Sequence, residues 1–512
     1  MANPREIELK LELDSAGVGS RLPAGLRRLP GVVGGRRLRS RYFDTADLAL
    51  HREGLTLRVR GDGEGFVQTV KREAGTSLIE RPEWEITLRR DEPDLAAAVA
   101  SGAPAHLQEV GALVPVFETR IARTAWRFER GGSDIELVFD QGEVATGAQA
   151  SPIREIELEL KGGAPGELFR LARELARRMP LRLGIQSKSE RGYRLVTGSS
   201  PGPAKAEKLH LAADADAGEA FRAVALACLR HFRLNEAGII DGRDPESLHQ
   251  ARVAIRRLRS AFTLFRPVID DDESRRLMAA LRRLSAALGE ARNLDVYLSR
   301  RIGSEVERQP GEPGLPELRT RIEVDRERAY DRIVRRLRSA PFRVLTIDLL
   351  AFVEDGDWRR DEAGSSTRGG PARDFAASVL DRRWRKLRKS GRHLDKLAPA
   401  DRHEVRIAAK KLRYASEFFA GLFRGKEARR RHKDFVAALE GLQGELGSLN
   451  DIATGHEMAV SLARGLDGTR ETPALLFAAG HLSGEADAHE AELLRAAAEA
   501  HKAIRKAKPF WA

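Results

Sequence analysis

The chain has 512 residues and a single cysteine, which predicts at least two domains, each with its own core, and excludes an internal disulfide or a cysteine-clustered zinc site. Its formal net charge of +13 predicts a polyanionic partner, such as a phosphate polymer, a nucleic acid or an anionic membrane surface. No apolar run approaches the roughly 18 residues that span a bilayer and the start lacks a signal-peptide pattern, so we expect a cytoplasmic protein with no membrane partner.

The first part of the chain shows the period-two alternation of β-strands. In the opening segment Glu6, Glu8 and Lys10 alternate with Ile7 and Leu9, which places polar and apolar side chains on opposite faces. The same alternation predicts short antiparallel strands at residues 55–60, 66–71, 83–86, 117–128, 135–139 and 155–160. Glycine-rich turns separate these segments, and residues 94–100 and 166–178 have the pattern of helices.

A change of period marks the domain boundary. Residues 198–204, Gly-Ser-Ser-Pro-Gly-Pro-Ala, have no periodicity and are typical of a flexible linker. Beyond them the apolar residues follow the helical period, and a second break at 361–371 divides the helical part in two. We therefore predict a first domain at 1–196, a linker at 197–212 and a helical domain at 213–510. The helical domain consists of two pieces, at about 213–360 and 371–510.

The two helical pieces form an internal repeat. The segment HQARVAIRRLR that begins at His249 matches HEVRIAAKKLR beginning at His403, and LGEARNLD at 288–295 corresponds to LGSLND at 446–451. In each segment the histidine and three cations lie on one helical stripe, where like charges repel and an anion would relieve the repulsion. One such helix would be explained by a solvated basic face, but the recurrence favours anion binding. The candidate residues are His249, Arg252, Arg256, Arg257, Arg259, His403, Arg406, Lys410, Lys411 and Arg413.

The first domain begins and ends with acidic strands. Glu6 and Glu8 share a strand face, as do Glu157 and Glu159 near the end of the domain. Carboxylates packed together in a low-dielectric interior repel and take up protons unless divalent cations or water separate them. Strands between them supply cations that match phosphate oxygens: Arg58, Arg60, Lys71, Arg120, Arg123 and Arg127. A solvated sheet face would explain one acidic strand, whereas this combination favours a metal-bridged phosphate chain.

Seven motifs follow one another in residues 4–196: Glu6-x-Glu8-x-Lys10, YFDT at 42–45, LRVR at 57–60, TVK at 69–71, RPEWE at 81–85, EIELEL at 155–160 and SKS at 187–189. In this order they resemble the CYTH family, the triphosphate tunnel metalloenzymes. The resemblance implies a closed eight-stranded antiparallel barrel whose tunnel binds a triphosphate and hydrolyses its terminal phosphoanhydride. A closed barrel also explains a polar interior under an apolar exterior.

The same resemblance implies roles for individual residues. It implies that Glu6, Glu8, Glu157 and Glu159 hold Mg²⁺ or Mn²⁺, and that phosphate is bound by Lys10, Arg58, Arg60, Lys71, Arg120 and Lys188. It further implies acidic tunnel positions at Glu83, Glu85 and Asp140.

Residues 213–505 resemble the CHAD domain, an α-helical domain named for its histidines. The resemblance implies two four-helix bundles related by pseudo-symmetry, with inorganic polyphosphate as the ligand. The expected protein is thus an α+β multidomain chain that hydrolyses inorganic triphosphate or short polyphosphate and binds longer polyphosphate, with polyphosphate granules as one place of association. The alternatives are a non-catalytic polyphosphate-binding protein, an adenylyl cyclase and a thiamine triphosphatase. Nucleic acid is the less favoured polyanion.

Overall fold

The computed structural model describes residues 5–13, 25–27, 32–61, 65–72, 77–147, 149–198, 202–308, 314–361, 364–464 and 490–512, with single positions at 23, 29, 63, 478 and 480. Contacts divide the chain into two compact units. The first comprises Met1–Pro203 and Arg336–Gly356, and the second comprises Ala204–Arg335 and Asp357–Ala512. The segment at 336–356, which the sequence pattern placed with the helical domain, therefore packs with the first unit.

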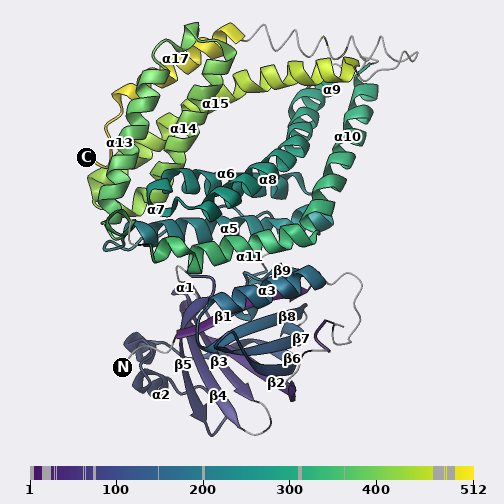
Figure 1. Cartoon of the computed structure of the whole chain (residues 1–512), viewed down its shortest axis with the longest axis vertical. Coiled ribbons are helices and arrows are strands. Elements are labelled where there is room, and N and C mark those ends of the chain that lie inside the picture. The colour runs from purple at the N-terminus through teal and green to yellow at the C-terminus, as the bar shows by residue number, and fades with distance from the viewer. Residues whose placement is uncertain are drawn as a thin grey trace. The chain divides into compact units, whose positions relative to one another are not determined.

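The first unit is built on a closed eight-stranded antiparallel barrel, as expected (Figure 1). The strand order is β5-β4-β3-β2-β6-β7-β8-β1, and β1 also pairs with β5, which closes the sheet. A short β9 (Leu181–Leu183) adds to the far part of β1. The barrel strands are β1 (Arg5–Leu13), β2 (Val32–Asp44), β3 (Leu55–Gly61), β4 (Phe66–Arg72), β5 (Glu80–Leu88), β6 (Val114–Arg130), β7 (Ser133–Thr146) and β8 (Gln149–Gly162).

Helices cover the apolar outer face of the barrel. On one side α2 (Leu95–Ala100) and the 3₁₀ turn at Ala105–Glu109 pack with Leu57, Val59 and Trp84, whose strand neighbours point inward. On another side α3 (Gly166–Arg178) contacts β8 and β9, and α11 (Ala340–Asp355) packs on α3. These helices remove the apolar outer residues from water, so the polar residues of the same strands line the interior. A further short helix, α1 (Ala49–Arg52), contacts β3.

The helix α4 (Lys188–Val196) packs at one end of the barrel interior. Its Tyr193 ring packs edge-on against Phe117, with ring centroids 5.1 Å apart, and the Tyr193 hydroxyl donates to buried Asp44 at 2.9 Å. A Cβ at Gly192 would lie 2.1 Å from the Phe117 ring, so the close approach of this helix to β6 requires glycine. The side chain of Ser187 caps the helix, which fixes its first residue relative to the strands.

The second unit is helical, and its internal repeat is visible in the element order. The helices α5, α6 and α8 of the first piece correspond to α13, α14 and α15 of the second, and α6 packs on α14. Phe221 and Phe265 of the first piece meet Phe375 and Phe419 of the second in one aromatic core. Within the described residues, no helix is long and apolar enough to cross a membrane. The helices are α5 (Ala217–Gly242), α6 (Pro245–Leu264), α7 (Arg266–Ile269), α8 (Asp272–Val296), α9 (Gly303–Arg308), α10 (Gly314–Leu337), α12 (Ser365–Arg368), α13 (Ala372–Ser390), α14 (Pro399–Phe419), α15 (Lys426–Arg464) and α17 (Glu490–Lys506).

Candidate active site

Three carboxylates form a row across adjacent strands inside the barrel. Backbone pairing places Glu8 of β1 opposite Glu159 of β8, and Glu159 opposite Glu136 of β7. All three line the interior cavity. Their side chains are 11% (Glu8), 26% (Glu159) and 28% (Glu136) exposed, so water and ions reach them. We call Glu8, Glu136 and Glu159 the first carboxylate row.

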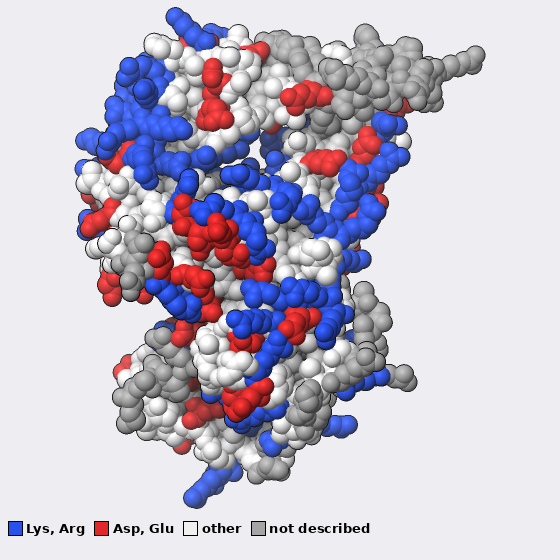
Figure 2. All heavy atoms as spheres, viewed as in Figure 1, with Lys and Arg blue, Asp and Glu red and all other residues white. Residues whose placement is uncertain are grey.

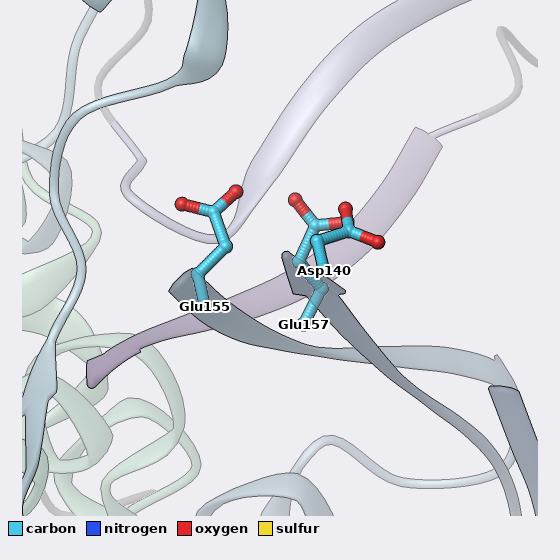
Figure 3. Close-up of side chains that lie close together, drawn as sticks. All are labelled: Asp140, Glu155 and Glu157. Atoms are coloured by element: carbon cyan, nitrogen blue, oxygen red, sulfur yellow. The ribbon is translucent and has the colours of Figure 1, made fainter. Parts of the chain in front are cut away.

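A second carboxylate row lies farther along the same strands. Glu12 pairs with Glu155, and Glu155 pairs with Asp140. The side chains of Asp140 and Glu155 are fully buried. Figure 3 shows the carboxylates of Asp140, Glu155 and Glu157 pointing to the same side of β7 and β8. One oxygen from each of these three lies within 4.8 Å of the others.

Glu157 lies between the two rows and is surrounded by cations. Its Oε1 accepts from Lys10 Nζ at 2.7 Å and from Lys188 Nζ at 2.8 Å, while Oε2 accepts from Arg123 at 2.9 Å. Burial alone would raise the pKa of Glu157, but the three cations hold that pKa well below its usual range. Glu157 is therefore an anion with its oxygens already engaged.

Cations predominate at the opposite wall of the barrel. Lys71 Nζ lies 2.9 Å from Glu83, and the guanidinium groups of Arg58 and Arg60 each lie 3.8 Å from Glu85. The adjacent charge of Arg58, together with burial, lowers the pKa of Arg60. Two guanidinium groups that repel each other in a partly buried cavity form a site for an anion.

The barrel encloses a cavity of about 520 Å³. Among the described side chains that line it, eight are Lys or Arg and seven are Asp or Glu, so the wall is nearly neutral. The wall residues alone would therefore not balance the negative charge of a compact polyanion, and its binding would need added cations. The charged lining residues are Glu8, Lys10, Arg58, Arg60, Lys71, Arg81, Glu83, Glu85, Arg123, Glu136, Asp140, Glu157, Glu159, Lys161 and Lys188.

Most of the residues that the sequence singled out meet in this cavity, but Glu6, Arg120 and Arg127 are exceptions. Arg127 pairs with Asp134 at 2.7 Å, and its side chain is 56% exposed. The side chain of Glu6 lies outside the described part of the structure. Arg120 points away from the cavity: its guanidinium pairs with Glu118 and, at 3.4 Å, with Glu143, and its side chain is 61% exposed. This corrects the expectation for Arg120, because β6 alternates so that Arg123 and not Arg120 faces inward.

Two arginines of β6, Arg120 and Arg123, provide a matched pair of variants. Arg123 donates two hydrogen bonds of 2.7 Å to Asp140 and also contacts Glu157, whereas Arg120 is on the outer face. We expect Arg123→Ala to lower any activity of the cavity at least about tenfold, because two buried carboxylates lose their partner. Arg120→Ala should leave the rate within about twofold. Equal losses in the two variants, measured as initial rates on folded protein, would contradict this assignment.

Among the charged residues that line the cavity, the sequence analysis assigned no role to Arg81, Glu136 and Lys161. Glu136 occupies the polar position between Ile135 and Leu137 in a segment that was predicted as a strand, so the alternation could have identified it. Lys161 lies 2.6 Å from Glu159 and 3.6 Å from Glu136, just beyond the predicted strand.

The first carboxylate row fits a divalent metal. Its carboxylate oxygens are the hard ligands that Mg²⁺ and Mn²⁺ prefer, they come from three adjacent strands, and they border the cavity. Lysines also contact this row, Lys161 at 2.6 Å from Glu159 and Lys10 at 2.8 Å from Glu8, but its carboxylates are partly exposed. The buried cluster of Asp140, Glu155 and Glu157 fits less well, because the side chains of Asp140 and Glu155 are fully buried and the Lys188 ammonium lies 2.5–2.8 Å from all three.

The helical unit contains a second cavity, of about 890 Å³, between its two repeats. Six of its lining residues were singled out from the repeat: His249, Arg252, Arg256, Arg406, Lys410 and Arg413. The repeat is also visible in its contacts, because Arg252 donates to Asn293 at 3.4 Å and Arg406 donates to Asn450 at 3.0 Å. The same asparagine of each repeat therefore holds the equivalent arginine.

Comparisons with known proteins agree with this division. Residues 4–193 match the CYTH domain family, and residues 223–460 match the CHAD domain family. The crystal structure of the CHAD domain from the plant Ricinus communis is 30% identical, with a TM-score of 0.52, and the match covers 60% of this chain and 99% of that one. The chain therefore belongs to the CHAD family and carries a CYTH domain before it.

Two further relatives match parts of the chain. An inorganic triphosphatase of Haemophilus influenzae is 32% identical over 194 residues, which is 37% of this chain and 55% of the relative. The chain thus spans about half the length of this curated relative. The structure of PptA from Streptomyces chartreusis is 16% identical, with a TM-score of 0.41, and the match covers 57% of this chain and 99% of that one.

The cavity of the CHAD domain holds closely spaced cations. Burial and the neighbouring Arg406, Arg256 and Arg252 lower the pKa of Lys410 to about 7. Burial, together with Arg292, lowers the pKa of His249 to about 4, so this imidazole is neutral at pH 7 and can donate or accept a hydrogen bond without adding charge.

The remaining predicted residues of the CHAD repeat do not line this cavity. Arg257 pairs with Glu417, Arg259 donates to Ser285 at 3.0 Å, and Lys411 lies near Arg383 and Lys386. His403 shares Asn450 with Arg406, at 2.9 Å. The sequence analysis missed Arg292, Arg300 and Arg301 as lining residues; only Arg292 lies in the repeated LGEARNLD motif.

The surface of the CHAD domain is also basic. Figure 2 shows Lys and Arg crowded at the upper left, where α13 lies in Figure 1. The second half of α13 carries exposed cations at Arg382, Arg385, Lys386, Arg388 and Lys389. Such a field attracts polyanions over several ångströms and is screened by salt.

Proposed function

We propose that the CYTH domain hydrolyses the terminal phosphoanhydride of inorganic triphosphate or short polyphosphate with the help of Mg²⁺ or Mn²⁺. The observation that carries the proposal is the arrangement of the cavity inside the barrel, in which carboxylates line the wall of β1, β7 and β8 and cations line the wall of β3 and β4. The similarity to a protein named inorganic triphosphatase supports the same reaction.

The roles follow from the two walls. Arg58, Arg60 and Lys71 would bind the phosphate chain, and the first carboxylate row would hold the metal. A bound divalent metal supplies Lewis-acid stabilisation of the phosphate oxygens. Glu85, which accepts from Thr69 at 2.8 Å and is about half exposed, would orient the attacking water.

No covalent nucleophile is needed for this reaction. Three serines line the cavity: Ser40, Ser187 and Ser189. Ser187 and Ser189 hydrogen-bond each other at 2.6 Å, and Ser187 also caps α4. The hydroxyl of Ser187 thus has a structural role at the start of α4, and we propose water as the attacking group.

A substrate panel tests the proposal. Purified full-length chain is mixed with tripolyphosphate, long-chain polyphosphate, ATP or thiamine triphosphate, with Mg²⁺ or Mn²⁺, and phosphate and cyclic nucleotide are measured. We expect tripolyphosphate to react at least about tenfold faster than the nucleoside and thiamine esters, and EDTA to stop the reaction. Cyclic AMP from ATP would support the adenylyl cyclase alternative. Absence of phosphate release under every condition would support a protein that only binds polyphosphate.

We further propose that the CHAD domain binds polyphosphate in its cavity, in the cytoplasm. The support is the duplicated set of cations around one cavity and the hydrogen bonds that orient Arg252 and Arg406. A long flexible chain of phosphates, each with one charge, fits a cavity in which cations from both repeats face one another. Competition between polyphosphate and duplex DNA at physiological salt distinguishes this ligand from nucleic acid.

Affinity for long-chain polyphosphate should depend on pH through Lys410. Its pKa of about 7 in the free domain means that it is neutral at pH 8.5 and protonated at pH 6. A bound polyanion favours the protonated form, so binding takes up a proton at high pH and affinity falls as pH rises from 6 to 8.5. We expect a fall of about tenfold that Lys410→Met abolishes, measured by calorimetry in buffers of different ionisation enthalpy. A wild-type affinity that does not change over this range would contradict the prediction.

A further inference from the structure

One helix of the barrel unit comes from a distant part of the chain. Helix α11 belongs to the first compact unit by its contacts, although its residues fall inside the stretch 223–460 that matches the CHAD family. It packs on α3 and contacts β9, and its residues 349–353 are all buried. The chain on both sides of it, up to Arg335 and from Asp357, belongs to the helical unit. The barrel unit is therefore completed by a segment of CHAD-family sequence.

Polar contacts fix the position of α11 on α3. Arg343 Nε donates to the carbonyl of Ala176 at 3.0 Å, in the last turn of α3. Asp348 Oδ1 accepts from Arg173 Nε at 2.6 Å, and the Asp348 side chain is 9% exposed. Because these contacts hold α11 at two points along its length, the place of its last turn, which carries Glu354, is determined within the barrel unit itself.

Glu354 holds the segment that leads into β5. Its Oε1 accepts from Ser77 Oγ at 2.7 Å and from the Leu78 amide at 3.3 Å. Ser77 Oγ in turn accepts from the amides of Ile79 at 3.1 Å and Glu80 at 3.0 Å. A serine hydroxyl has one hydrogen to donate and two lone pairs to accept, so this hydroxyl uses all three. The conformation of residues 77–80 therefore depends on Ser77 and on the carboxylate that orients it.

Residues 77–80 lie at the seam where the barrel closes. Among the described residues, β1 pairs with β5 at three positions and with β8 at five. One of the three partners on β5 is Pro82, which has no N–H to donate. A further bond extends this short seam, because the Glu8 amide donates to the carbonyl of Ile79 at 2.8 Å. The backbone of Glu8 is thus attached to the segment that Glu354 holds.

The two sides of the seam carry residues of the cavity. Glu8 of the first carboxylate row comes from β1, and Arg81 comes from β5, two residues after Ile79. Hydrogen bonds connect Glu354 with Ser77, Ser77 with the Ile79 amide, and the Ile79 carbonyl with the Glu8 amide. Partners that orient a metal ligand from behind typically change metal affinity by about 10- to 100-fold. Glu354 is placed to act on the carboxylate row in this way, although it does not line the cavity.

We propose that Glu354 is a positioning residue of the barrel site, which fixes residues 77–80 and, through the seam between β1 and β5, the position of Glu8. The CYTH site thereby depends on a residue that the CHAD-family stretch supplies. The expected effect on metal binding rests on the proposed metal-dependent function. The expected effect on the seam is independent of it.

Hydrogen exchange of the full-length chain, followed by amide-resolved mass spectrometry, tests the effect on the seam. In Glu354→Ala the amides of Glu8 and Ile79 should exchange at least about tenfold faster than in wild type, because the segment that carries their partners loses its anchor. Glu354→Gln keeps an acceptor oxygen in the same place and should restore protection to within about twofold of wild type. Unchanged exchange at Glu8 in Glu354→Ala would overturn the proposal.

Arg343→Ala is the matched control for a general effect of α11. It removes a contact between the same helix and α3 but leaves Glu354 and its partners in place. We expect it to lower the stability of the barrel unit and to leave exchange at Glu8 within about twofold of wild type. If Arg343→Ala and Glu354→Ala speed exchange at Glu8 equally, the seam responds to loosening of the whole helix, and the specific role of Glu354 is wrong.

Metal affinity gives a second measurement. Mn²⁺ alone is titrated into the substrate-free chain and followed by electron paramagnetic resonance. We expect Glu354→Ala to raise the Kd of Mn²⁺ at least about fivefold and Glu354→Gln to stay within about twofold of wild type. The KM for tripolyphosphate at saturating metal should change less than about twofold in both variants, because Glu354 touches no phosphate-binding residue. Unchanged Mn²⁺ affinity in Glu354→Ala would overturn its role at the site. Faster exchange at Glu8 and weaker Mn²⁺ binding in Glu354→Ala, with no triphosphatase activity in wild type, would support Glu354 as proposed and reject the proposed hydrolysis.

Discussion

Replacing Glu8 by Gln lowers the rate of phosphate release from tripolyphosphate at least about 100-fold at saturating substrate, because a metal ligand is lost from the first carboxylate row. Glu8 lines the cavity, its side chain is 11% exposed, and it contacts Lys10 at 2.8 Å. Glutamine keeps the size of the side chain and one oxygen, so the barrel should fold. Its neutral oxygen is a weaker ligand for a hard cation.

The same loss is expected for Glu159→Gln, which pairs with Glu8 across the strands. Raising the metal concentration should restore part of the activity in either variant, since the defect is in metal affinity. Glu118→Gln is the matched control, because Glu118 lies on the outer face of β6 and pairs with Arg39 and Arg120. Equal activity of Glu8→Gln and wild type at limiting metal would reject the metal site in this row.

Reversing two charges in the CHAD cavity should have the second largest effect. We expect Arg252→Glu with Arg406→Glu to weaken binding of long-chain polyphosphate at least about 100-fold, since two oriented cations are replaced by anions on facing repeats. Both guanidinium groups line the cavity, and each is held by an asparagine of its own repeat. The number of phosphates contacted should also fall, and with it the steepness of the salt dependence.

The control for this variant is a pair of exposed cations on α13. Arg382→Glu with Lys389→Glu changes the net charge by the same amount on the surface of the domain. Its effect should be small at physiological salt, where long-range attraction is screened. If both double variants lose affinity equally, polyphosphate is attracted by the overall field and the cavity is not its binding site. Fluorescence anisotropy of labelled polyphosphate at several salt concentrations measures both affinity and salt slope.

The faces of individual strands were predictable where only one face is polar. Glu8 and Lys10 alternate with Leu9, and Arg58 and Arg60 alternate with Val59, so their common inward direction follows from the period of two. The prediction was wrong for Arg120, because β6 is long and carries polar residues on both faces. Its outer residues pair with charges in water, and alternation alone does not say which face is inward.

The register between neighbouring strands could not be predicted from the sequence pattern. The first carboxylate row exists because Glu8, Glu159 and Glu136 align across three strands that lie far apart in the chain. Local periodicity determines a face within one strand, but the partner opposite each residue depends on non-local pairing. The motifs quoted for the family resemblance include Glu159 and not Glu136.

The order of the two domains along the chain and the repeat in the helical domain could be determined from the sequence by itself. It determined a domain of short antiparallel strands followed by a duplicated helical domain, because strand and helix periods are local and the two repeats share residues at matching positions. The closure of those strands into a barrel was implied by the family resemblance and not by the periodicity. Only the tertiary structure decided what each charge faces. It placed residues 336–356 with the barrel unit, Arg123 on Asp140, and the Lys188 ammonium among three buried carboxylates. Burial and ion pairing arise when distant segments meet, so the roles of these cations became visible only in the fold.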